Sequence, residues 1–349
     1  MPAEWEPQSG VQLTWPHAGT DWAPMLDEVQ QTYEEMAREI MKRESLLIIA
    51  PEGTPLPKVN GKSSIVNTND TWARDHGFIT LVDDEGDNRK LLNFCFNGWG
   101  EKFPAELDNA INRHLYDEGS VAGEYIDHMD FVLEGGSIES DGKGTIFTTS
   151  CCLLAPYRNQ PLTRDEIEER LKSYLCADRV LWIDHGSLVG DDTDGHIDTL
   201  VRVAPDDTLL YIGCDDPQDQ QYEELYLMEQ QLRTFRTLEG RSYRLLRLPM
   251  PRPIYDGDDR LPATYANFLA VNGAVLCPTY DQPDLDAMAL QVIAEAFPGR
   301  DIVGIDCRSL IRQHGSLHCC TMQFPEGVLT HNSHNSHEPH EPHEPHESY

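Results

Sequence analysis

Short apolar segments with strand character alternate with helical segments along residues 1–330, and this alternation limits the folds open to the chain more than any other feature. The first predicted helix carries apolar residues at helical spacing, namely Leu26, Val29, Tyr33, Met36 and Ile40. A unit of strand, strand, helix and strand then recurs about five times, although its copies share no clear sequence. The alternation predicts an α/β fold.

Local signals place several of the remaining elements. The run Thr163-Arg164-Asp165-Glu166 is a capping box that opens a helix ending near residue 175. Further helices are predicted at 105–116, 219–237 and 283–297. Strands that border conspicuous polar motifs are predicted at 131–133, 199–203 and 317–322.

The chain has one compositional boundary. No linker of low complexity divides residues 1–330, so we expect one catalytic domain there. Residues 331–349 consist of His-Asn-Ser and His-Glu-Pro repeats followed by Ser-Tyr. Proline at every third position of the latter repeats blocks helices and strand ladders, which predicts a disordered tail.

The acidic composition limits the classes of partner. A formal net charge of -33 would repel phosphates, so no nucleic-acid partner is expected. The same field would speed the approach of a cationic small molecule, although acidity also keeps a protein soluble. No apolar run is long enough to span a membrane, and the opening residues 1–6 lack a signal peptide, which together predict a cytoplasmic protein.

The nine cysteines are expected to be free thiols, because their number is odd and no secretory signal is evident. No Cys-x-x-Cys pair occurs, so a structural zinc site is not expected.

The first of three acidic motifs contains Trp72, Arg74 and Asp75 within the run 69–77. An aspartate can accept two hydrogen bonds from a guanidinium group, and a tryptophan face can hold the same cation by stacking. The alternative is a structural ion pair made by Arg74 in a loop.

The second motif is Glu134-Gly135-Gly136, which follows an apolar strand. A carboxylate at the end of a buried strand suits the floor of a pocket, and glycine lets the backbone approach a ligand closely. A solvated glutamate in a glycine-rich turn is the alternative.

The third motif, residues 191–198, ends in His196 and Asp198. If this end is already extended, both side chains lie on one face of the strand, where His196 could exchange protons while Asp198 holds a substrate. Acidic loops also suggest calcium, but His196 occupies the position where the EF-hand pattern requires glycine. No bound metal is therefore expected.

Cys319 and Cys320 lie in a predicted strand and would point to opposite faces, so only one of them can enter a given site. A lone cysteine is usually a small buried hydrophobe, and it becomes a nucleophile when its surroundings or a cationic substrate stabilise the thiolate. A thiol, a histidine and several carboxylates suit attack on a carbon that already carries positive charge, which points to a guanidinium substrate.

Six blocks of sequence occur in an order that resembles the agmatine deiminase and bacterial-type peptidylarginine deiminase family of the guanidine-modifying (pentein) superfamily. They span about residues 5–327 and comprise Glu6-Pro7-Gln8 with Thr14-Trp15-Pro16, then residues 70–77, 96–100, 133–137, 192–198 and 318–323. The resemblance implies an α/β propeller with fivefold pseudosymmetry around a central active site. It also implies that no cofactor is needed.

The resemblance further implies a role for each of six residues. Cys319 matches the nucleophile and His196 the general acid/base. Asp75 and Asp198 match the carboxylates that grip the guanidinium group. Glu134 matches the acidic partner of the histidine and the substrate, and Trp72 matches an aromatic wall.

The implied activity is hydrolysis of agmatine to N-carbamoylputrescine and ammonia, a step toward putrescine and other polyamines. The run Gln313-His314-Gly315-Ser316-Leu317-His318-Cys319 departs from the family's usual Gly-Gly-Gly-Asn-Ile-His-Cys. Deimination of arginine or peptidylarginine therefore stays open, as does a non-catalytic protein that binds guanidines or polyamines. A homo-oligomer is compatible with the sequence.

Overall fold

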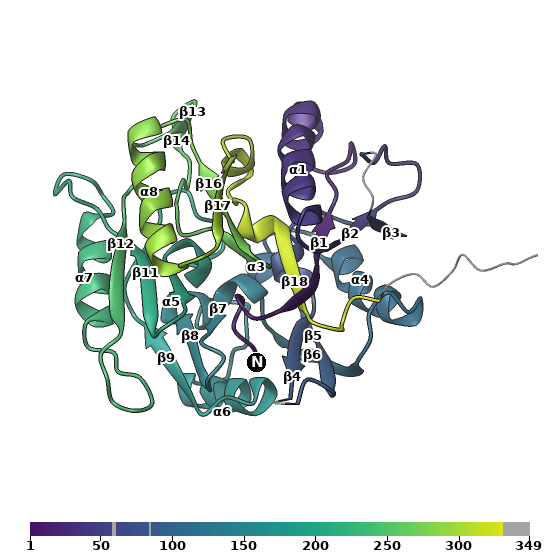
Figure 1. Cartoon of the computed structure of the whole chain (residues 1–349), viewed down its shortest axis with the longest axis horizontal. Coiled ribbons are helices and arrows are strands. Elements are labelled where there is room, and N and C mark those ends of the chain that lie inside the picture. Colours follow the sequence, from purple (N-terminus) through teal and green to yellow (C-terminus); the bar gives the residue numbers. More distant parts are fainter. Residues whose placement is uncertain (58–60, 84, 331–349) are drawn as a thin grey trace, which may run out of the picture.

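The computed structural model describes residues 1–57, 61–83 and 85–330, which form a mixed α/β fold (Figure 1). The predicted tail at 331–349 lies outside the described residues. The longer helices are α1 (Leu26–Met41), α4 (Glu106–Asp117), α6 (Arg164–Leu175), α7 (Tyr222–Leu232) and α8 (Pro283–Ala296). Short helices are α2 (Ala73–His76), α3 (Gly98–Glu101), α5 (Ser150–Leu153), η1 (Ala23–Met25), η2 (Gly135–Ser137), η3 (Ile197–Thr199), η4 (Leu310–Gln313) and η5 (His318–Cys320).

The strands of the described residues form five sheets and one small hairpin. In order, the sheets are β18 (Thr321–Pro325), β1 (Gln8–Thr14), β2 (Ser45–Ala50), β3 (Lys62–Ile65); β4 (Ile79–Val82), β5 (Arg89–Cys95), β6 (Glu124–Val132); β7 (Ile138–Ser140), β8 (Thr145–Thr149), β9 (Arg179–Ile183); β10 (Val201–Ala204), β11 (Thr208–Ile212), β12 (Arg244–Leu248); and β15 (Leu269–Val271), β16 (Ala274–Thr279), β17 (Asp301–Asp306). The hairpin joins β13 (Tyr255–Asp256) and β14 (Asp259–Arg260).

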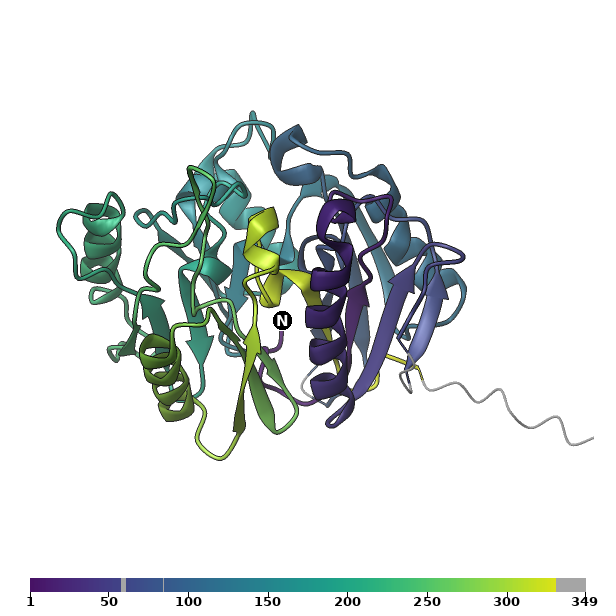
Figure 2. The ribbon, with the colours of Figure 1, turned by 90° about the horizontal axis from the view of Figure 1, so that it is seen from above.

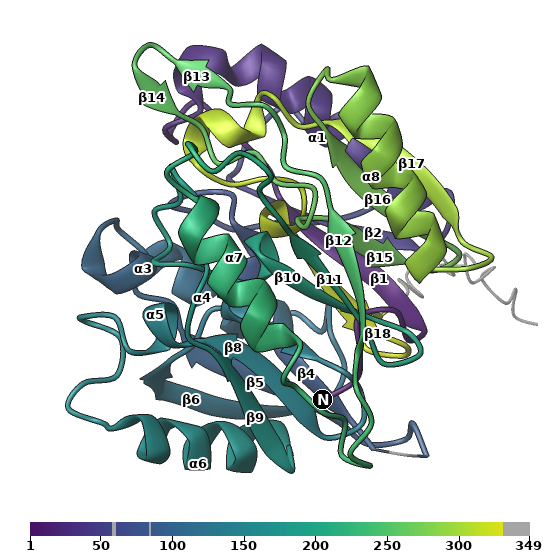
Figure 3. The same cartoon turned by 90° about the vertical axis from the view of Figure 1, so that its left-hand side faces the viewer.

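Each of the five sheets repeats one pattern. An antiparallel pair of strands is followed by a parallel neighbour, as in β4–β5–β6 and β15–β16–β17. Parallel strands need a crossover, and α1, α4, α6, α7 and α8 each lie in one of these crossovers. Figure 3 shows α7 and α8 on the outside of the sheets, and Figure 2 shows α1 beside the first sheet. The predicted alternation and the α/β class are confirmed.

The first sheet joins the two ends of the described chain. Strand β1 pairs antiparallel with β18, with Leu13 opposite Thr321, and parallel with β2. This pairing places η5, which precedes β18, next to α2 near the start of the chain. The segments that carry Asp75 and Cys319 are thereby brought together.

Several element predictions are confirmed with their local causes. Helix α6 begins at the capping box, in which Thr163 Oγ1 accepts from the Glu166 backbone N–H and Glu166 Oε2 accepts from the Thr163 backbone N–H at 2.7 Å. Helix α8 begins with Pro283 in its first turn, where the missing N–H costs nothing. The helix predicted at 219–237 is shorter in the structure, where α7 spans Tyr222–Leu232.

Two predicted strands begin later than expected. Residues 318–320 form η5 instead of a strand, because the Asn267 side chain accepts from the backbone N–H groups of His318 and Cys319 and so replaces a strand partner. Likewise Ile197–Thr199 form η3, and β10 begins at Val201. The expectation that strand alternation separates Cys319 from Cys320 is therefore wrong in its geometry.

No helix in the described ranges is both long and apolar enough to cross a membrane. The expected cytoplasmic location stays a prediction.

Candidate active site

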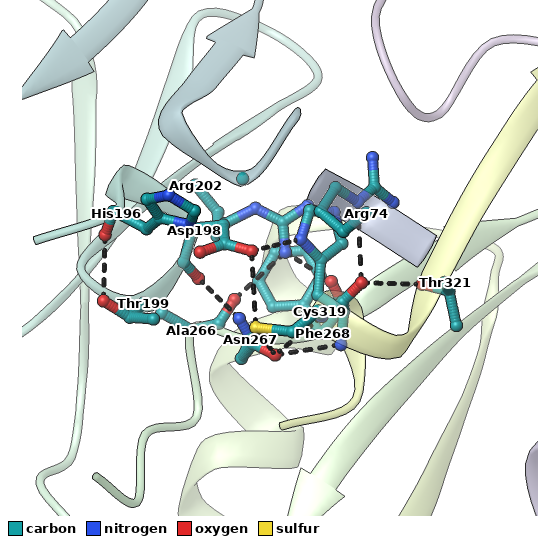
Figure 4. A network of polar contacts seen from close by, with 12 residues as sticks. Arg74, His196, Asp198, Thr199, Arg202, Ala266, Asn267, Phe268, Cys319 and Thr321 are labelled. Carbon is teal, nitrogen blue, oxygen red and sulfur yellow. Dashed lines mark hydrogen bonds and ion pairs between the residues drawn. The ribbon is translucent and has the colours of Figure 1, made fainter. Parts of the chain in front are cut away.

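Cys319 lies in η5 with its sulfur among polar groups. Its Sγ is 3.4 Å from Asn267 Oδ1 and 3.8 Å from Asp198 Oδ2 (Figure 4). The side chain is 5 % exposed, so the sulfur can be reached from a pocket while most of the residue is covered. Burial, followed by the charges of Asp198 and Asp75, raises the pKa of the Cys319 thiol well above its ordinary value. The thiol is therefore protonated near neutral pH unless a cation approaches.

Asp75 and Asp198 come from different short helices, α2 and η3. Asp75 Oδ2 accepts from Trp99 Nε1 at 2.9 Å, and its Oδ1 accepts from the Gly136 backbone N–H at 3.1 Å. Asp198 Oδ2 accepts from His318 Nδ1 at 2.7 Å, whereas its Oδ1 has no partner among the described residues. Each carboxylate is thus fixed by the protein and keeps capacity to accept from a ligand.

The two aspartates differ in their ionisation. Burial raises the pKa of Asp75 to about 6, against the opposing effect of His196. Burial would also raise the pKa of Asp198, but the hydrogen bond and charge of His318 outweigh it and lower that pKa. Asp198 is therefore the more firmly charged of the pair.

His196 immediately precedes η3 and is completely buried. Its Nδ1 lies 3.7 Å from Asp75 Oδ1, and within the described residues neither ring nitrogen makes a hydrogen bond. Burial lowers the pKa of His196, but Asp75, Glu134 and Asp198 together raise it above the ordinary value. A protonated imidazole held beside Asp75 can act as a general acid.

Glu134 lies two residues after the end of strand β6 and immediately before η2, as expected for a carboxylate beyond the end of a strand. It is fully buried, and its Oε1 accepts from Arg158 Nε at 2.8 Å. The other oxygen has no partner in the part of the chain that the structure describes. The solvated-turn alternative for Glu134 is therefore wrong, and one oxygen remains available to a ligand or to His196.

Gly136 is the point that these groups share. A Cβ atom at this position would lie 2.6 Å from His196 Nδ1, 2.9 Å from Asp75 Oδ1 and 3.2 Å from Asp198 Oδ2. Contacts this short would force the side chains of His196 and Asp75 to move, so glycine is what leaves the space between the three groups open. The second glycine of the motif has a steric purpose inside the site.

A pocket leads from the surface to Cys319. It is lined by Trp72, Trp99 and Asp75 and by three further carboxylates, Asp21, Asp70 and Asp192. No lysine or arginine lines this pocket within the described ranges. Its chemistry suits a ligand with positive charge at both ends.

The structure brings the six predicted site residues to one place. Trp72, Asp75 and Cys319 line the pocket, and the others lie just behind it. Arg74, the alternative focus of the first motif, points away from the pocket and lies 3.8 Å from Glu4. Donor atoms of Glu134, Cys152 and His196 lie within 4.8 Å of one another, a spacing open to a metal ion, although Arg158 already holds one Glu134 oxygen.

Sequence reasoning missed three residues that shape the site. Asn267 accepts from two backbone N–H groups of η5 and so fixes Cys319, but nothing around it in the sequence marks it. Arg158 anchors Glu134, and it lies in a loop without a recognisable signal. Trp99 had a sequence signal, because the glycines on either side of it permit an unusual backbone. In the structure, Gly98, Trp99 and Gly100 all have positive φ, which is uncommon for tryptophan.

Comparison with known proteins shows to which family the chain belongs. The sequence profile of the Porphyromonas-type peptidyl-arginine deiminase family matches residues 1–325. The chain belongs to this family. The resemblance inferred from the six sequence blocks is thereby confirmed.

The names of similar proteins refer to two different activities. A proposed arginine deiminase of Porphyromonas gingivalis is 49% identical, with a TM-score of 0.89 over 95% of this chain and 99% of that one. The agmatine deiminase of Campylobacter jejuni, solved as a cysteine-to-serine variant with substrate bound, is 36% identical, with a TM-score of 0.85 over 94% and 96%. The agmatine deiminase of Pseudomonas aeruginosa strain UCBPP-PA14 is 33% identical over 93% of this chain and 95% of its own length.

Proposed function

We propose that this protein is an agmatine deiminase, which hydrolyses agmatine to N-carbamoylputrescine and ammonia. The observation that carries the proposal is the position of the Cys319 thiol at the end of a pocket that is lined by carboxylates and lacks lysine and arginine among the described residues. The agmatine deiminase relatives and the hydrolase class predicted from the sequence agree with it.

The site geometry supports a covalent mechanism. A guanidinium group between Asp75 and Asp198 would donate to both carboxylates and bring its central carbon next to Cys319 Sγ. The positive charge of the ligand offsets the two aspartates that hold the thiol protonated, so its binding favours loss of that proton to solvent and formation of the thiolate.

The thiolate forms a C–S bond to the guanidinium carbon, which gives a neutral tetrahedral species. Protonated His196 transfers its proton to one terminal amino group, the C–N bond breaks, and ammonia leaves an amidino-thioether on Cys319. Neutral His196 then takes a proton from water as the oxygen attacks the same carbon. The C–S bond breaks, the thiolate departs, and the carbonyl of the ureido product forms as the oxygen loses its remaining proton to solvent.

The three further carboxylates of the pocket favour agmatine over arginine. Asp21, Asp70 and Asp192 can accept from the terminal ammonium of agmatine. Burial raises the pKa of Asp70 to about 6, and a nearby ammonium would keep it ionised. An arginine substrate would place its α-carboxylate among these acids without a lysine or arginine on the described pocket wall to pair with it.

Arginine deimination is the second candidate, because the Porphyromonas gingivalis relative has been described in that way. Release of ammonia and of ureido product should be measured with agmatine, arginine and a peptide that ends in arginine. We expect kcat/KM to be highest for agmatine. A higher value for either other substrate would replace the proposal, and binding without turnover would indicate a guanidine-binding protein.

The wider architecture is inferred on the same basis. We infer that the five sheets are the blades of an α/β propeller with fivefold pseudosymmetry and that residues 1–330 act as one catalytic domain. The shared strand pattern of the sheets supports this inference, as does the likeness to the agmatine deiminase structures.

A further inference from the structure

A buried polar network lies behind Asp198, on the side away from the pocket. The His318 imidazole links Asp198 to Glu4, because its Nδ1 is 2.7 Å from Asp198 Oδ2 and its Nε2 is 2.7 Å from Glu4 Oε2. His318 is 1 % exposed. The ring thus bridges two carboxylates, and Arg202 Nη2 also lies 3.1 Å from its Nε2.

Glu4 is itself held firmly. Its Oε2 accepts from Arg202 Nη2 at 2.9 Å, and its Oε1 accepts from the Ala270 backbone N–H at 2.7 Å. These contacts, with that of His318, hold the pKa of Glu4 well below its ordinary value although burial alone would raise it. The carboxylate is a charged and immobile anchor for His318.

Arg202 completes the anchor. Its Nε donates to Glu139 Oε1 at 2.6 Å, and its Nη1 donates to the carbonyl oxygen of Ala266 at 3.1 Å. The guanidinium carbon lies 4.4 Å from the centre of the Phe268 ring (Figure 4). Each of the three guanidinium nitrogens has an acceptor, so Arg202 is structural and does not face a substrate.

The network fixes the orientation of the Asp198 carboxylate. His318 holds Oδ2, the oxygen that also lies 3.8 Å from Cys319 Sγ, while Oδ1 has no partner within the described parts of the chain. The His318 backbone N–H also donates to the Asn267 side chain, which fixes the base of the imidazole. Rotation of the Asp198 carboxylate would break its hydrogen bond to His318, a costly loss for a buried carboxylate.

We propose that His318, anchored by Glu4 and Arg202, is a positioning residue that holds the Asp198 carboxylate toward the guanidinium group of the substrate. This inference rests on the proposed function. It means that residues at the start of the chain act on the site through a histidine that precedes the nucleophile.

Two substitutions of His318 distinguish the roles of its two ring nitrogens. An asparagine amide can replace the Nδ1 donor, which serves Asp198, and a glutamine amide can replace the Nε2 donor, which serves Glu4. We expect His318→Gln to lower kcat/KM for agmatine by about 100-fold and His318→Asn by only about 10-fold, within the range typical of residues that orient a ligand group. If packing alone mattered, the larger glutamine would be the better replacement.

A double-mutant cycle tests the route of the effect. In an Asp198→Asn background, His318→Gln should lower kcat/KM by less than about 3-fold further, because its target is already lost. Should His318→Gln fail to fold, Glu4→Gln takes its place in the cycle, with an expected loss of about 10-fold alone and little in the Asp198→Asn background. Glu6→Gln, an exposed residue of the same segment, is the matched control and should match the wild type.

The outcomes distinguish this inference from the proposed function. If the wild type releases no ammonia from any guanidine, the proposed function fails. If the wild type is active but His318→Asn is as impaired as His318→Gln, or if either effect adds fully to that of Asp198→Asn, the positioning role is wrong while the function stands.

Discussion

The two sides of Asp198 differ in how completely their polar atoms are paired. Toward the pocket, both nitrogens of His196, one oxygen of Glu134 and one oxygen of Asp198 have no partner among the described residues. Behind it, Glu4, Glu139 and Arg202 pair with one another or with backbone groups, and only Arg74 Nη2 lacks a hydrogen bond within the described part of this network. Unpaired buried polar atoms are costly, so their concentration on one side marks where a ligand supplies the missing partners.

The charges follow the same division. The rear network sets Arg202, Arg74 and His318 beside its carboxylates, whereas Asp75 lines a pocket whose described wall carries no lysine or arginine. The protein thus leaves a deficit of positive charge in front that matches a guanidinium group. Each prediction below tests whether front and rear behave as differently as this division implies.

The largest contrast is expected between two adjacent thiols. Cys319 faces the carboxylates, while Cys320 is fully buried in the hydrophobic core, where burial raises its pKa. Cys319→Ser should lower kcat for agmatine by roughly 10⁴-fold or more, as expected for loss of a nucleophile. Cys320→Ala should retain most of the activity, and inactivity of this variant with a normal Tm would contradict the assignment.

Substitution of either aspartate should lower kcat/KM to a similar extent. Asp75→Asn and Asp198→Asn each remove a charged acceptor from the guanidinium group, which typically costs about 2–5 kcal/mol of transition-state binding, or roughly 30- to several thousand-fold in kcat/KM. Steady-state kinetics with agmatine measure the effect. Near-normal kinetics in either variant would exclude that residue as a substrate ligand.

The same two variants should differ in stability. The pKa of Asp75 is raised to about 6, so its charge opposes folding at neutral pH, and Asp75→Asn should leave Tm level or raise it. The pKa of Asp198 is lowered, so its charge stabilises the fold above its unfolded pKa, and Asp198→Asn should lower Tm. Thermal unfolding at about pH 7.5 and about pH 5.5 tests this, because the advantage of Asp75→Asn should shrink at the lower pH.

A smaller effect is expected in the pH profile of the wild type. Asp75 must be ionised to bind the cation, and its pKa of about 6 predicts that kcat/KM falls about 10-fold per pH unit well below pH 6. A profile that stays flat to about pH 5 would mean that Asp75 is not a substrate ligand or that its charge is unimportant.

The smallest effect is expected from chelators. The guanidinium carbon already carries positive charge, and the thiol and imidazole supply the nucleophile and the proton transfers, so no Lewis acid is needed. Incubation with EDTA should change kcat/KM by less than about 2-fold. Loss of activity that one metal ion restores would direct attention to Glu134, Cys152 and His196.

The sequence predicted those parts of the site whose signals are local. Asp75, Glu134, His196 and Cys319 each lie in a short motif with a distinctive composition, and the structure brings these motifs together. The helices with clear caps and periodicity, such as α6, were also predictable. In both cases the information lies within about ten residues of the chain.

The remaining parts depend on contacts between distant residues. Arg202 donates to Glu4, and Asn267 converts the predicted strand at 318–320 into η5, but neither partner can be identified from its own neighbours. Strand alternation predicted only that one of Cys319 and Cys320 enters a given site, a reason that does not apply in η5. The resemblance to the family selected Cys319, and this choice stays a prediction.

The pairing of β1 with β18 has a consequence for synthesis of the protein. Leu13 leaves the ribosome early, whereas its partner Thr321 emerges only after almost the whole described chain has been made. Contacts between such distant residues are slow to form, and the proposed nucleophile Cys319 lies two residues before this last strand. On the proposed mechanism, a nascent chain that already carries Asp75 and His196 has no thiol in place, so we expect enzymatic activity to begin only when translation of the described chain is nearly complete.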